Sequence, residues 1–219
     1  MAPSNTVIPA TPSDKKYSES EVAELEWLEA DDPIALSLSW LAQAAETEPA
    51  DSNAMSLSTV DENGLPDARI VLLKGLDERG FVFYTNGESA KAQQLRGGKA
   101  ALCFHWKSQK RQLRVRGSVS PVSAEESDAY FAQRARGSRL GAWASDQSRP
   151  VLDRPTMIKR VEEVEHRFEG RDVPRPPHWY GWRVHPEAIE FWQDGAFRLH
   201  DRIVFTPSEE GWTKTRLYP

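Results

Sequence analysis

Residues 197–205 read FRLHDRIVF, and basic or titratable side chains occupy every second position of the central part. Because successive side chains of a strand point to opposite faces, this spacing predicts a strand with Arg198, His200 and Arg202 on one face. Three such groups side by side favour an anionic ligand as their partner. The opposite face is apolar and is expected to hold the strand on the core: Phe197, Leu199, Ile203 and Phe205.

A second basic segment is RIVLLK, in which Arg69 and Lys74 bracket four aliphatic residues. The two cations are five positions apart, so a regular strand sends them to opposite faces. For both side chains to contribute to one binding site, the strand must contain a bulge or a bend, or the site must lie at a subunit boundary. An edge strand with charged ends is the alternative interpretation.

Two expected helices also carry basic residues. Lys91 falls in the first turn of SAKAQQLRGG, where the helix dipole disfavours a cation unless a phosphate binds there. In AYFAQRARGSR, Tyr130 and Arg134 are four residues apart and share a helix face, with Ser138 just beyond. The alternatives are a solvated lysine and a solvated helix face.

Other catalytic patterns are missing from the sequence. It contains no GxSxG, HExxH or P-loop motif, no GxGxxG in a strand–helix context, and its five histidines lack metal-ligand spacing. We therefore expect no metal site. The single cysteine, Cys103, lies in the apolar stretch AALCFHW and is interpreted as a small buried hydrophobe.

Composition limits the partners. The chain has 219 residues, a formal net charge of −5, 39% hydrophobic and 28% charged residues, which is ordinary for a globular protein. A broad nucleic-acid-binding surface is not expected at this charge. The apolar runs are too short to cross a membrane, and the N-terminal residues lack a secretory pattern. A cytoplasmic protein without membrane or nucleic-acid partners is expected.

Pattern changes along the chain indicate its elements. Residues 1–16 are rich in Pro, Ser and Thr and are expected to be disordered, and residues 17–31 form a weak helix or a mobile arm. Helices are predicted after the caps Asp32, Ser89 and Ser123, and over RPTMIKRVEEVEHRFEG, residues 154–170. Between and after them run short β segments joined by turns such as DENG and DERG, and YGWRVH and AIEFWQ are predicted as two separate strands.

Roughly seven to nine short strands with about four helices do not show the βαβ alternation of a parallel sheet. They fit a mainly β fold, an antiparallel barrel with helices on its outside. We expect residues 31–219 to form a single domain and residues 1–30 an N-terminal arm.

The segment EFWQDGAFRLHDR, residues 190–202, closely resembles the signature of pyridoxamine 5′-phosphate oxidases, the FMN enzymes of vitamin B6 metabolism. Further segments resemble the family in the same order, among them YFAQRARGSRLGAWASDQS, VPRPPHWYGWRV and the closing RLYP. The resemblance covers about residues 30–219. It implies an FMN-binding split β-barrel, antiparallel and Greek-key-like, that forms a homodimer with two FMN sites at the subunit interface.

The resemblance also assigns the cofactor site. Arg69 and Lys91 match the residues that hold the FMN phosphate, and Gln147 and Ser148 match a segment that reaches FMN from the partner subunit. The remaining matches line or complete the flavin site: Arg69, Ile70, Val71, Leu72, Leu73, Lys74, Tyr84, Thr85, Gln112, Trp192 and Arg202. Ala90 stands where the family often has an arginine, which removes one expected phosphate contact.

The substrate site implied by the resemblance uses the remaining basic residues. The cluster that binds the substrate phosphate is matched by Lys74, Tyr130, Arg134 and Ser138. Arg198 and His200, with Leu199 between them, match the catalytic pair over the pyridine ring. The implied reaction oxidises pyridoxamine and pyridoxine 5′-phosphates to pyridoxal 5′-phosphate and reduces O2 to H2O2. A phenazine-biosynthesis flavin oxidase and a non-catalytic FMN- or pyridoxal-phosphate-binding protein remain alternatives.

Overall fold

The computed structural model describes residue 14 and residues 25–219. The predicted disorder of residues 1–16 and most of the predicted arm lie outside these residues. The strands are β1 Ala54–Val60, β2 Pro66–Leu72, β3 Gly75–Asp77, β4 Gly80–Asn86, β5 Lys99–Trp106, β6 Arg111–Pro121, β7 Trp179–Gln193, β8 Asp201–Ser208 and β9 Gly211–Arg216. The helices are η1 Glu26–Glu29, α2 Pro33–Thr47, α3 Ala90–Leu95, α4 Ala124–Gln133, α5 Arg136–Ala144, α6 Arg154–Arg167 and η2 Ala196–Arg198.

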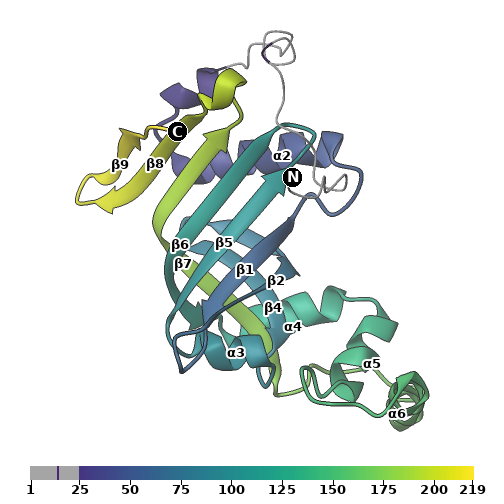
Figure 1. Ribbon diagram of the computed structural model, residues 1–219. Helices are drawn as coiled ribbons and strands as arrows, with labels where there is room; N and C mark the ends of the chain where they lie inside the picture. The colour runs from purple at the N-terminus through teal and green to yellow at the C-terminus, as the bar shows by residue number, and fades with distance from the viewer. Residues whose placement is uncertain (1–13, 15–24) are drawn as a thin grey trace, which may run out of the picture.

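One sheet unites all nine strands of the described chain, in the order β2-β1-β5-β6-β7-β4-β3, with β8 added to β7 and β9 to β8. Every pair in it is antiparallel. The sheet curls into a half-barrel with helices on its outside, which confirms the mainly β fold class (Figure 1). DERG joins β3 to β4 as a hairpin, as predicted.

Strand β7 is longer than the sequence suggested. YGWRVH and AIEFWQ were expected to be two strands, but they form one strand that pairs with β4 through its first half and with β6 along its length. The register against β6 shifts at Arg116/Gly117, opposite Pro186, which has no backbone N–H to offer a ladder. A Cβ at Gly117 would collide with the His185 carbonyl, so only glycine permits this close approach.

Helices α2, α3 and α4 begin at the residues that the sequence indicated. Asp32 accepts hydrogen bonds from the N–H groups of Ile34 and Ala35, with Pro33 at the first helical position. Ser89 caps α3, and Ser123 forms a capping box with Glu126 at the start of α4. These caps need only neighbouring residues, which is why the sequence alone could indicate them.

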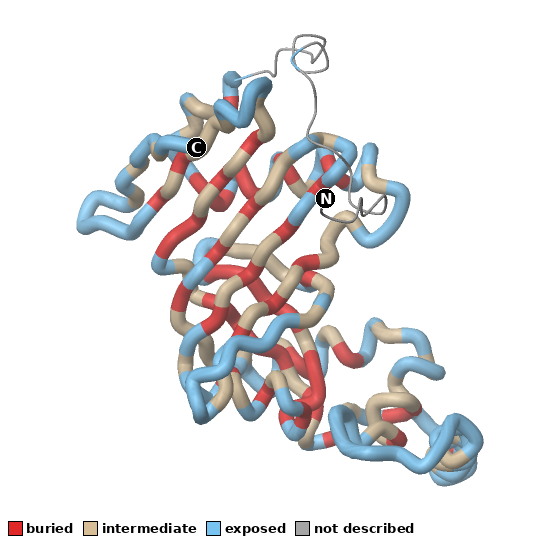
Figure 2. The backbone as a smooth tube through the Cα atoms, in the orientation of Figure 1, coloured by how far each residue is buried: buried red, intermediate tan, exposed pale blue. Residues whose placement is uncertain are grey.

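The core lies inside the half-barrel and under α2 (Figure 2). Burial alternates along β1, whereas β4 is buried at nearly every position. Trp40 of α2 is almost fully buried and packs edge-on against Trp27, Trp106 and Phe191. Helix α2 therefore closes one end of the barrel.

Helices α5 and α6 form a lobe beside the other end of the barrel (Figure 1). The lobe has a small core of its own, made by Leu140, Phe168 and Val173. Arg136 fastens it by donating to the carbonyl oxygens of Phe168 and Arg171, each at 2.8 Å. Ser145 and Gln147 then carry the chain back toward β4.

Two further sequence-based predictions about elements were wrong. The strand expected over 197–205 begins only at Asp201, because η2 and positive φ angles at Phe197 and Arg198 turn the chain beforehand. Ile203 and Phe205 are buried as expected, but Phe197 and Leu199 are exposed. The helix expected through AYFAQRARGSR breaks at Arg134, which takes an extended conformation between α4 and α5.

Among the described residues, no helix is long and apolar enough to span a bilayer. No group of His, Cys, Asp and Glu within the same part of the chain is arranged to hold a metal ion. Cys103 is half-buried, and burial raises the pKa of its thiol. The cytoplasmic location and the division into arm and domain stay predictions.

Candidate active site

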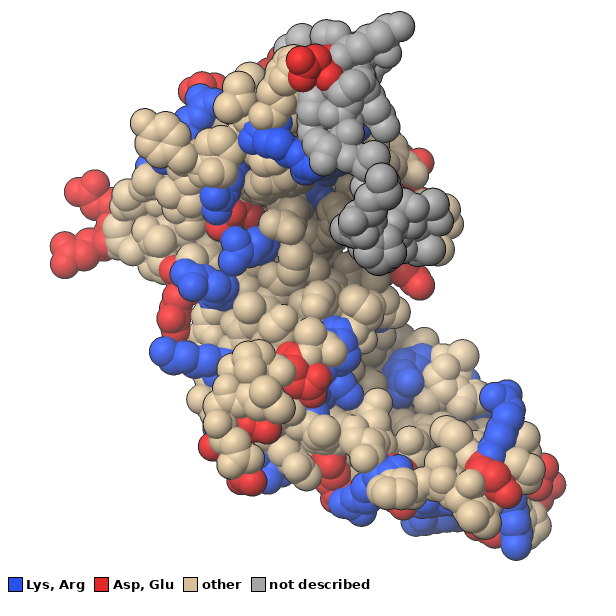
Figure 3. Space-filling view, viewed as in Figure 1, with Lys and Arg blue, Asp and Glu red and all other residues tan. Residues whose placement is uncertain are grey.

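A cavity of about 490 Å³ opens where β2 and β4 of the barrel face α3, α4 and the lobe. Its lining includes the expected phosphate cluster Lys74, Tyr130, Arg134 and Ser138. It also includes part of the expected cofactor set: Ile70, Val71, Leu72, Tyr84, Thr85, Lys91 and Gln147. Figure 3 shows basic side chains on the surface where the lobe meets the barrel.

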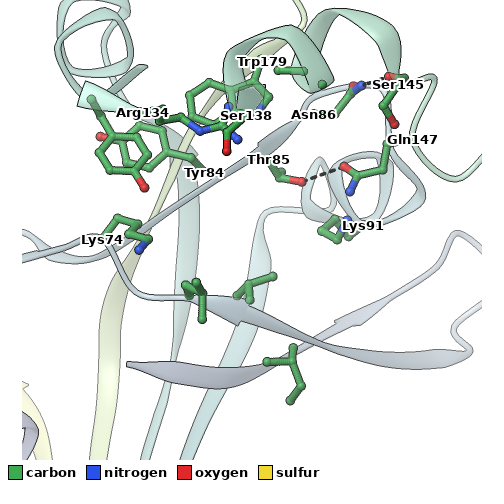
Figure 4. A pocket seen from close by; sticks show the side chains of 16 residues that line it. Lys74, Tyr84, Thr85, Asn86, Lys91, Arg134, Ser138, Ser145, Gln147 and Trp179 are labelled. Atoms are coloured by element: carbon green, nitrogen blue, oxygen red, sulfur yellow. Dashed lines mark hydrogen bonds between the residues drawn. The ribbon is translucent and has the colours of Figure 1, made fainter. Parts of the chain in front are cut away.

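One wall of the cavity is a stack of aromatic rings. The ring centroids of Tyr84 and Tyr130 are 4.1 Å apart, and those of Tyr84 and Trp179 are 5.4 Å apart, with nearly parallel planes. The Arg134 guanidinium lies over the Trp179 ring, with Cζ 4.6 Å from its centroid (Figure 4). Flat, parallel side chains of this kind suit a flat aromatic ligand with an anionic group.

Arg134 is a half-buried cation without an acid beside it. Its Nη1 atom is buried and has no hydrogen-bond partner, and burial lowers the pKa of its guanidinium. A partly buried charge of this kind is costly unless an opposite charge joins it. The break between α4 and α5 places Arg134 over the Trp179 ring. If the helix continued, the helical backbone would point this side chain in another direction. The unsatisfied guanidinium therefore fits an anion such as a phosphate.

A bend follows β2 and reorients Lys74, whereas Arg69 does not line the cavity. Strand β2 ends at Leu72, and the N–H groups of Leu73 and Lys74 then bond to opposite neighbours, the carbonyls of Asn53 and Val82. Lys74 consequently turns into the cavity. Leu73 is buried in the core and does not line the cavity.

A second cationic pair lies beside α3. Arg69 donates to Thr59, Asp67, Gln94 and the Leu57 carbonyl, so β1, β2 and α3 hold its guanidinium in place. Lys91 lies in the first turn of α3 as predicted, and burial and the positive charge of Arg69 together lower the pKa of its ammonium. A lysine next to an arginine, partly removed from water, is a further position that an anion would stabilise.

Gln147 approaches the cavity from the lobe. It accepts a hydrogen bond from Thr85 at 3.2 Å, and Asn86 donates to the Ser145 carbonyl at 3.1 Å (Figure 4). Gln147 thus lines the cavity of its own chain, and Ser148 follows with a positive φ. The expectation that Gln147 and Ser148 reach a cofactor from the partner subunit stays a prediction.

The other expected site residues gather elsewhere. Gln112, Trp192 and Arg202 face one another in register across β6, β7 and β8. Arg202 donates to Glu190 and to the Tyr218 carbonyl. Neither these residues nor Arg198, Leu199 and His200 line the cavity.

His200 is held in a defined orientation. The Gly195 N–H donates to His200 Nδ1 at 3.1 Å, and Asp194 Oδ1 also lies 3.1 Å from Nδ1. The centroids of the His200 and Trp192 rings are 4.7 Å apart. The N–H contact at Nδ1 leaves Nε2 as the nitrogen that a ligand can reach. Arg198 projects from the same turn with a φ of 66°.

Within one chain, the cavity residues and the group around Arg198 and His200 lie at opposite ends of β7. Trp179, in the cavity wall, opens β7, and Trp192 lies near the end of that strand. The strand between them has a contour length of roughly 40 Å, and neither Arg198 nor His200 lines the cavity. A single chain therefore does not bring Arg198 and His200 to the phosphate cluster.

Some residues of the site were not singled out from the sequence. Trp179 stacks under Arg134, Asn86 and Ser145 join the lobe to β4, and Glu190 pairs with both Arg114 and Arg202. Trp179 and Glu190 lie inside segments that carry the family resemblance, VPRPPHWYGWRV and EFWQDGAFRLHDR. The types and spacing of Trp179 and Glu190 give no further indication of the contacts that they make.

Comparison with solved structures defines the class. PhzG from Burkholderia lata, solved with tetrahydrophenazine-1-carboxylic acid, superposes with a TM-score of 0.83 at 28% identity, over 91% of this chain and 98% of its own. A pyridoxamine 5′-phosphate oxidase-related, FMN-binding protein from Nostoc punctiforme superposes with a TM-score of 0.69 at 16% identity, over 87% and 100% of the two chains. The fold is that of the split-barrel oxidoreductases.

Comparison of sequences defines the family. The family model described as Pyridoxamine 5′-phosphate oxidase matches residues 41–168, and that of the Pyridoxine 5′-phosphate oxidase C-terminal dimerisation region matches residues 179–219. A pyridoxine/pyridoxamine 5′-phosphate oxidase from Caulobacter vibrioides is 54% identical over the full length of both chains. One from Hyphomonas neptunium is 56% identical over 98% of this chain and 99% of its own. The chain belongs to the pyridoxamine 5′-phosphate oxidase family.

Proposed function

We propose that this chain oxidises pyridoxamine 5′-phosphate and pyridoxine 5′-phosphate to pyridoxal 5′-phosphate, with O2 reduced to H2O2. With the amine substrate, water is also consumed and ammonia is released. The observation that carries the proposal is the cavity in which Lys74, Tyr130, Arg134 and Ser138 meet an aromatic stack. A phosphate brings a charge of about −2 near neutral pH. It would supply the partner that Arg134 Nη1 lacks.

The cofactor that we propose is FMN. The residues present fit it, because Lys91 lines the cavity from α3, beside the Arg69–Asp67 pair and on another element than Lys74 and Arg134, and two phosphates require two cationic positions. When bound, the flavin supplies a two-electron acceptor for the substrate and passes these electrons to O2. Ala90 leaves Arg69 and Lys91 as the basic residues at the phosphate end.

We further propose a homodimer in which each site draws on both chains. The strongest support is the distance of Arg198 and His200 from the cavity in their own chain. The match of residues 179–219 to a dimerisation region supports the same assembly. A two-fold contact would let the end of one barrel complete the cavity of its partner.

Different residues of the chain then have different roles in substrate binding and in the reaction. Lys74, Arg134 and the hydroxyls of Tyr130 and Ser138 bind and orient the substrate phosphate. Arg198 clamps the other end of the substrate and stabilises negative charge that develops there. His200, fixed at Nδ1 by Gly195, holds or relays a proton at Nε2.

A phenazine-type oxidase is the second candidate, favoured by the superposition with PhzG. The phosphate cluster argues against it, since a ligand without a phosphate would leave Lys74 and Arg134 without a partner. The higher identity to pyridoxine/pyridoxamine 5′-phosphate oxidases supports the first proposal.

An anaerobic titration of the purified, FMN-loaded chain tests the proposal. We expect pyridoxine 5′-phosphate to bleach the flavin absorbance, air to restore it, and pyridoxal 5′-phosphate and H2O2 to accumulate together. Pyridoxine without its phosphate is the matched control and should bleach far less at equal concentration. Flavin binding without bleaching by either phosphate ester would refute the oxidase and favour a binding protein.

A further inference from the structure

Four charged side chains outside the cavity form one network on the flank of the barrel. Arg183 of β7 is almost fully buried and donates to Asp77 at 2.6 Å and to Glu126 at 2.8 Å. Arg79, which is exposed, donates to the same two carboxylates at 2.6 and 2.9 Å. Two arginines thus share two carboxylates, one on β3 and one on α4.

Glu126 is the member that links this network to a helix. Its Oε2 accepts from the Ser123 N–H as part of the capping box, while its Oε1 accepts from both guanidinium groups. Burial favours the neutral acid, but the Ser123 hydrogen bond and the two arginines outweigh it and keep the pKa of Glu126 below its ordinary value. The carboxylate therefore stays charged and fixes the first turn of α4 against β7.

Several other contacts hold α4 on the barrel. Tyr130 stacks on Tyr84 with ring centroids 4.1 Å apart, Phe131 packs edge-on against Trp179 at 5.1 Å, and Asp128 accepts from Arg175 at 2.6 Å. Ser127 and Phe131 are its buried residues. The Ser127 hydroxyl accepts from the Gly181 N–H at 3.2 Å, and Tyr84 approaches the Glu126 carbonyl at 3.4 Å. In the first turn of α4, the tertiary side-chain contacts are those of Glu126 and Ser127, so loss of the Glu126 anchor loosens this end of the helix.

The end of the same helix reaches the cavity. Tyr130 lies in its last turn and Arg134 is its C-cap. A helix rises about 1.5 Å per residue, so Glu126 and Arg134 are separated by roughly 12 Å of a stiff element. A tilt at the anchored end moves both phosphate ligands, and misplacement by about 1 Å is enough to weaken a site severely.

We propose that Arg183 is a positioning residue that, through Glu126, sets α4 and hence the affinity of the site for the phosphate of its substrate. The proposal rests on the proposed function for the identity of that substrate. Asp77 lies on β3 and cannot place the helix, whereas Glu126 is the carboxylate of this network that belongs to α4. A buried ion pair is also a weak source of stability compared with apolar packing.

A matched pair of variants tests the role. Glu126→Gln and Asp77→Asn each remove one carboxylate from the same two arginines, but only Glu126 belongs to α4. In Glu126→Gln, the single amide oxygen cannot serve both the cap and the arginines. We expect it to raise KM for pyridoxine 5′-phosphate roughly tenfold or more, with kcat nearly unchanged. Asp77→Asn should lower Tm at least as much and leave KM nearly unchanged.

Two further measurements separate positioning from general damage. Inorganic phosphate, used as a competitive inhibitor, should lose affinity for Glu126→Gln by the same factor as the substrate, while flavin loading stays at the wild-type level. Arg183→Lys, which keeps the charge but cannot bridge two carboxylates, should raise KM as Glu126→Gln does. An unchanged KM in Glu126→Gln, or an equal rise in Asp77→Asn, would overturn the proposal.

The same variants distinguish this proposal from the proposed function. If the wild-type chain fails to oxidise either phosphate ester, the proposed function has failed. Calorimetric titration with inorganic phosphate still compares Glu126→Gln with Asp77→Asn. Weaker phosphate binding in Glu126→Gln alone supports the positioning role, and equal binding in both variants refutes it.

Discussion

Replacement of Arg134 by methionine separates binding from stability more sharply than other changes in the cavity. Methionine keeps an unbranched apolar stem over Trp179 and removes the guanidinium, whose Nη1 has no partner in the protein. In the free protein, this change relieves a half-buried cation and loses its contact with the Trp179 ring. In the complex, it removes a charge-assisted hydrogen bond to the substrate phosphate.

The substitution is expected to affect KM and the free energy of unfolding by different amounts. Hydrogen bonds to charged groups contribute about 1.5–3 kcal/mol, which corresponds to a rise in KM of roughly 10- to 150-fold. The cation–π contact is worth about 0.5–2 kcal/mol, and the relief of the buried charge offsets it. We therefore expect the free energy of unfolding to change by less than about 1 kcal/mol, or about 2–4 °C in Tm for a chain of this size.

The assay combines steady-state kinetics with thermal unfolding of the same preparation. Arg136→Met is the matched control, because Arg136 lies two residues away and bonds to the Phe168 and Arg171 carbonyls of the lobe. It should lower Tm and leave KM nearly unchanged, the reverse of Arg134→Met. A normal KM in Arg134→Met, or a large fall in its Tm, would show that Arg134 is a structural residue.

Three other outcomes are expected. Because burial and the charge of Arg69 hold the pKa of Lys91 below its ordinary 10.5, FMN affinity should fall before the pH reaches 10.5, as Lys91 loses its proton, whereas Lys91→Arg should stay flat. Fluorescence titration measures both proteins, and parallel profiles would contradict the assignment. A Cβ at Gly195 would collide with the Leu199 carbonyl and displace His200, so Gly195→Ala should reduce kcat with Tm and flavin content near wild type; full turnover would exclude a role for that turn. Arg198→Ala should lower kcat by about 10²-fold, and undiminished turnover in stopped-flow assays would reject its catalytic role.

Local interactions were readable in the sequence. The caps Asp32, Ser89 and Ser123 act on backbone groups two or three residues away, and the structure confirms each of them. The DERG hairpin is of the same kind. These features need no knowledge of the rest of the chain, because the atoms involved are neighbours in sequence.

Alternation gave a partly wrong interpretation of FRLHDRIVF. It placed Arg198, His200 and Arg202 on one face, yet the turn at Phe197 and Arg198 breaks the strand period. Arg202 instead faces Glu190, and Asp201 pairs with Arg216 of β9. Residue types alone could not reveal this turn, since it depends on how Gly195 and Leu199 approach each other.

The sequence by itself determined the fold class, the helix starts and the family, because periodicity, caps and a specific motif are local properties. Only the tertiary structure decided which cations meet. It turned Lys74 into the cavity at a bend, broke a helix to bring Arg134 over Trp179, and left Arg198 and His200 at the other end of β7. Contacts between residues distant in sequence depend on strand order and chain curvature, which no local pattern encodes.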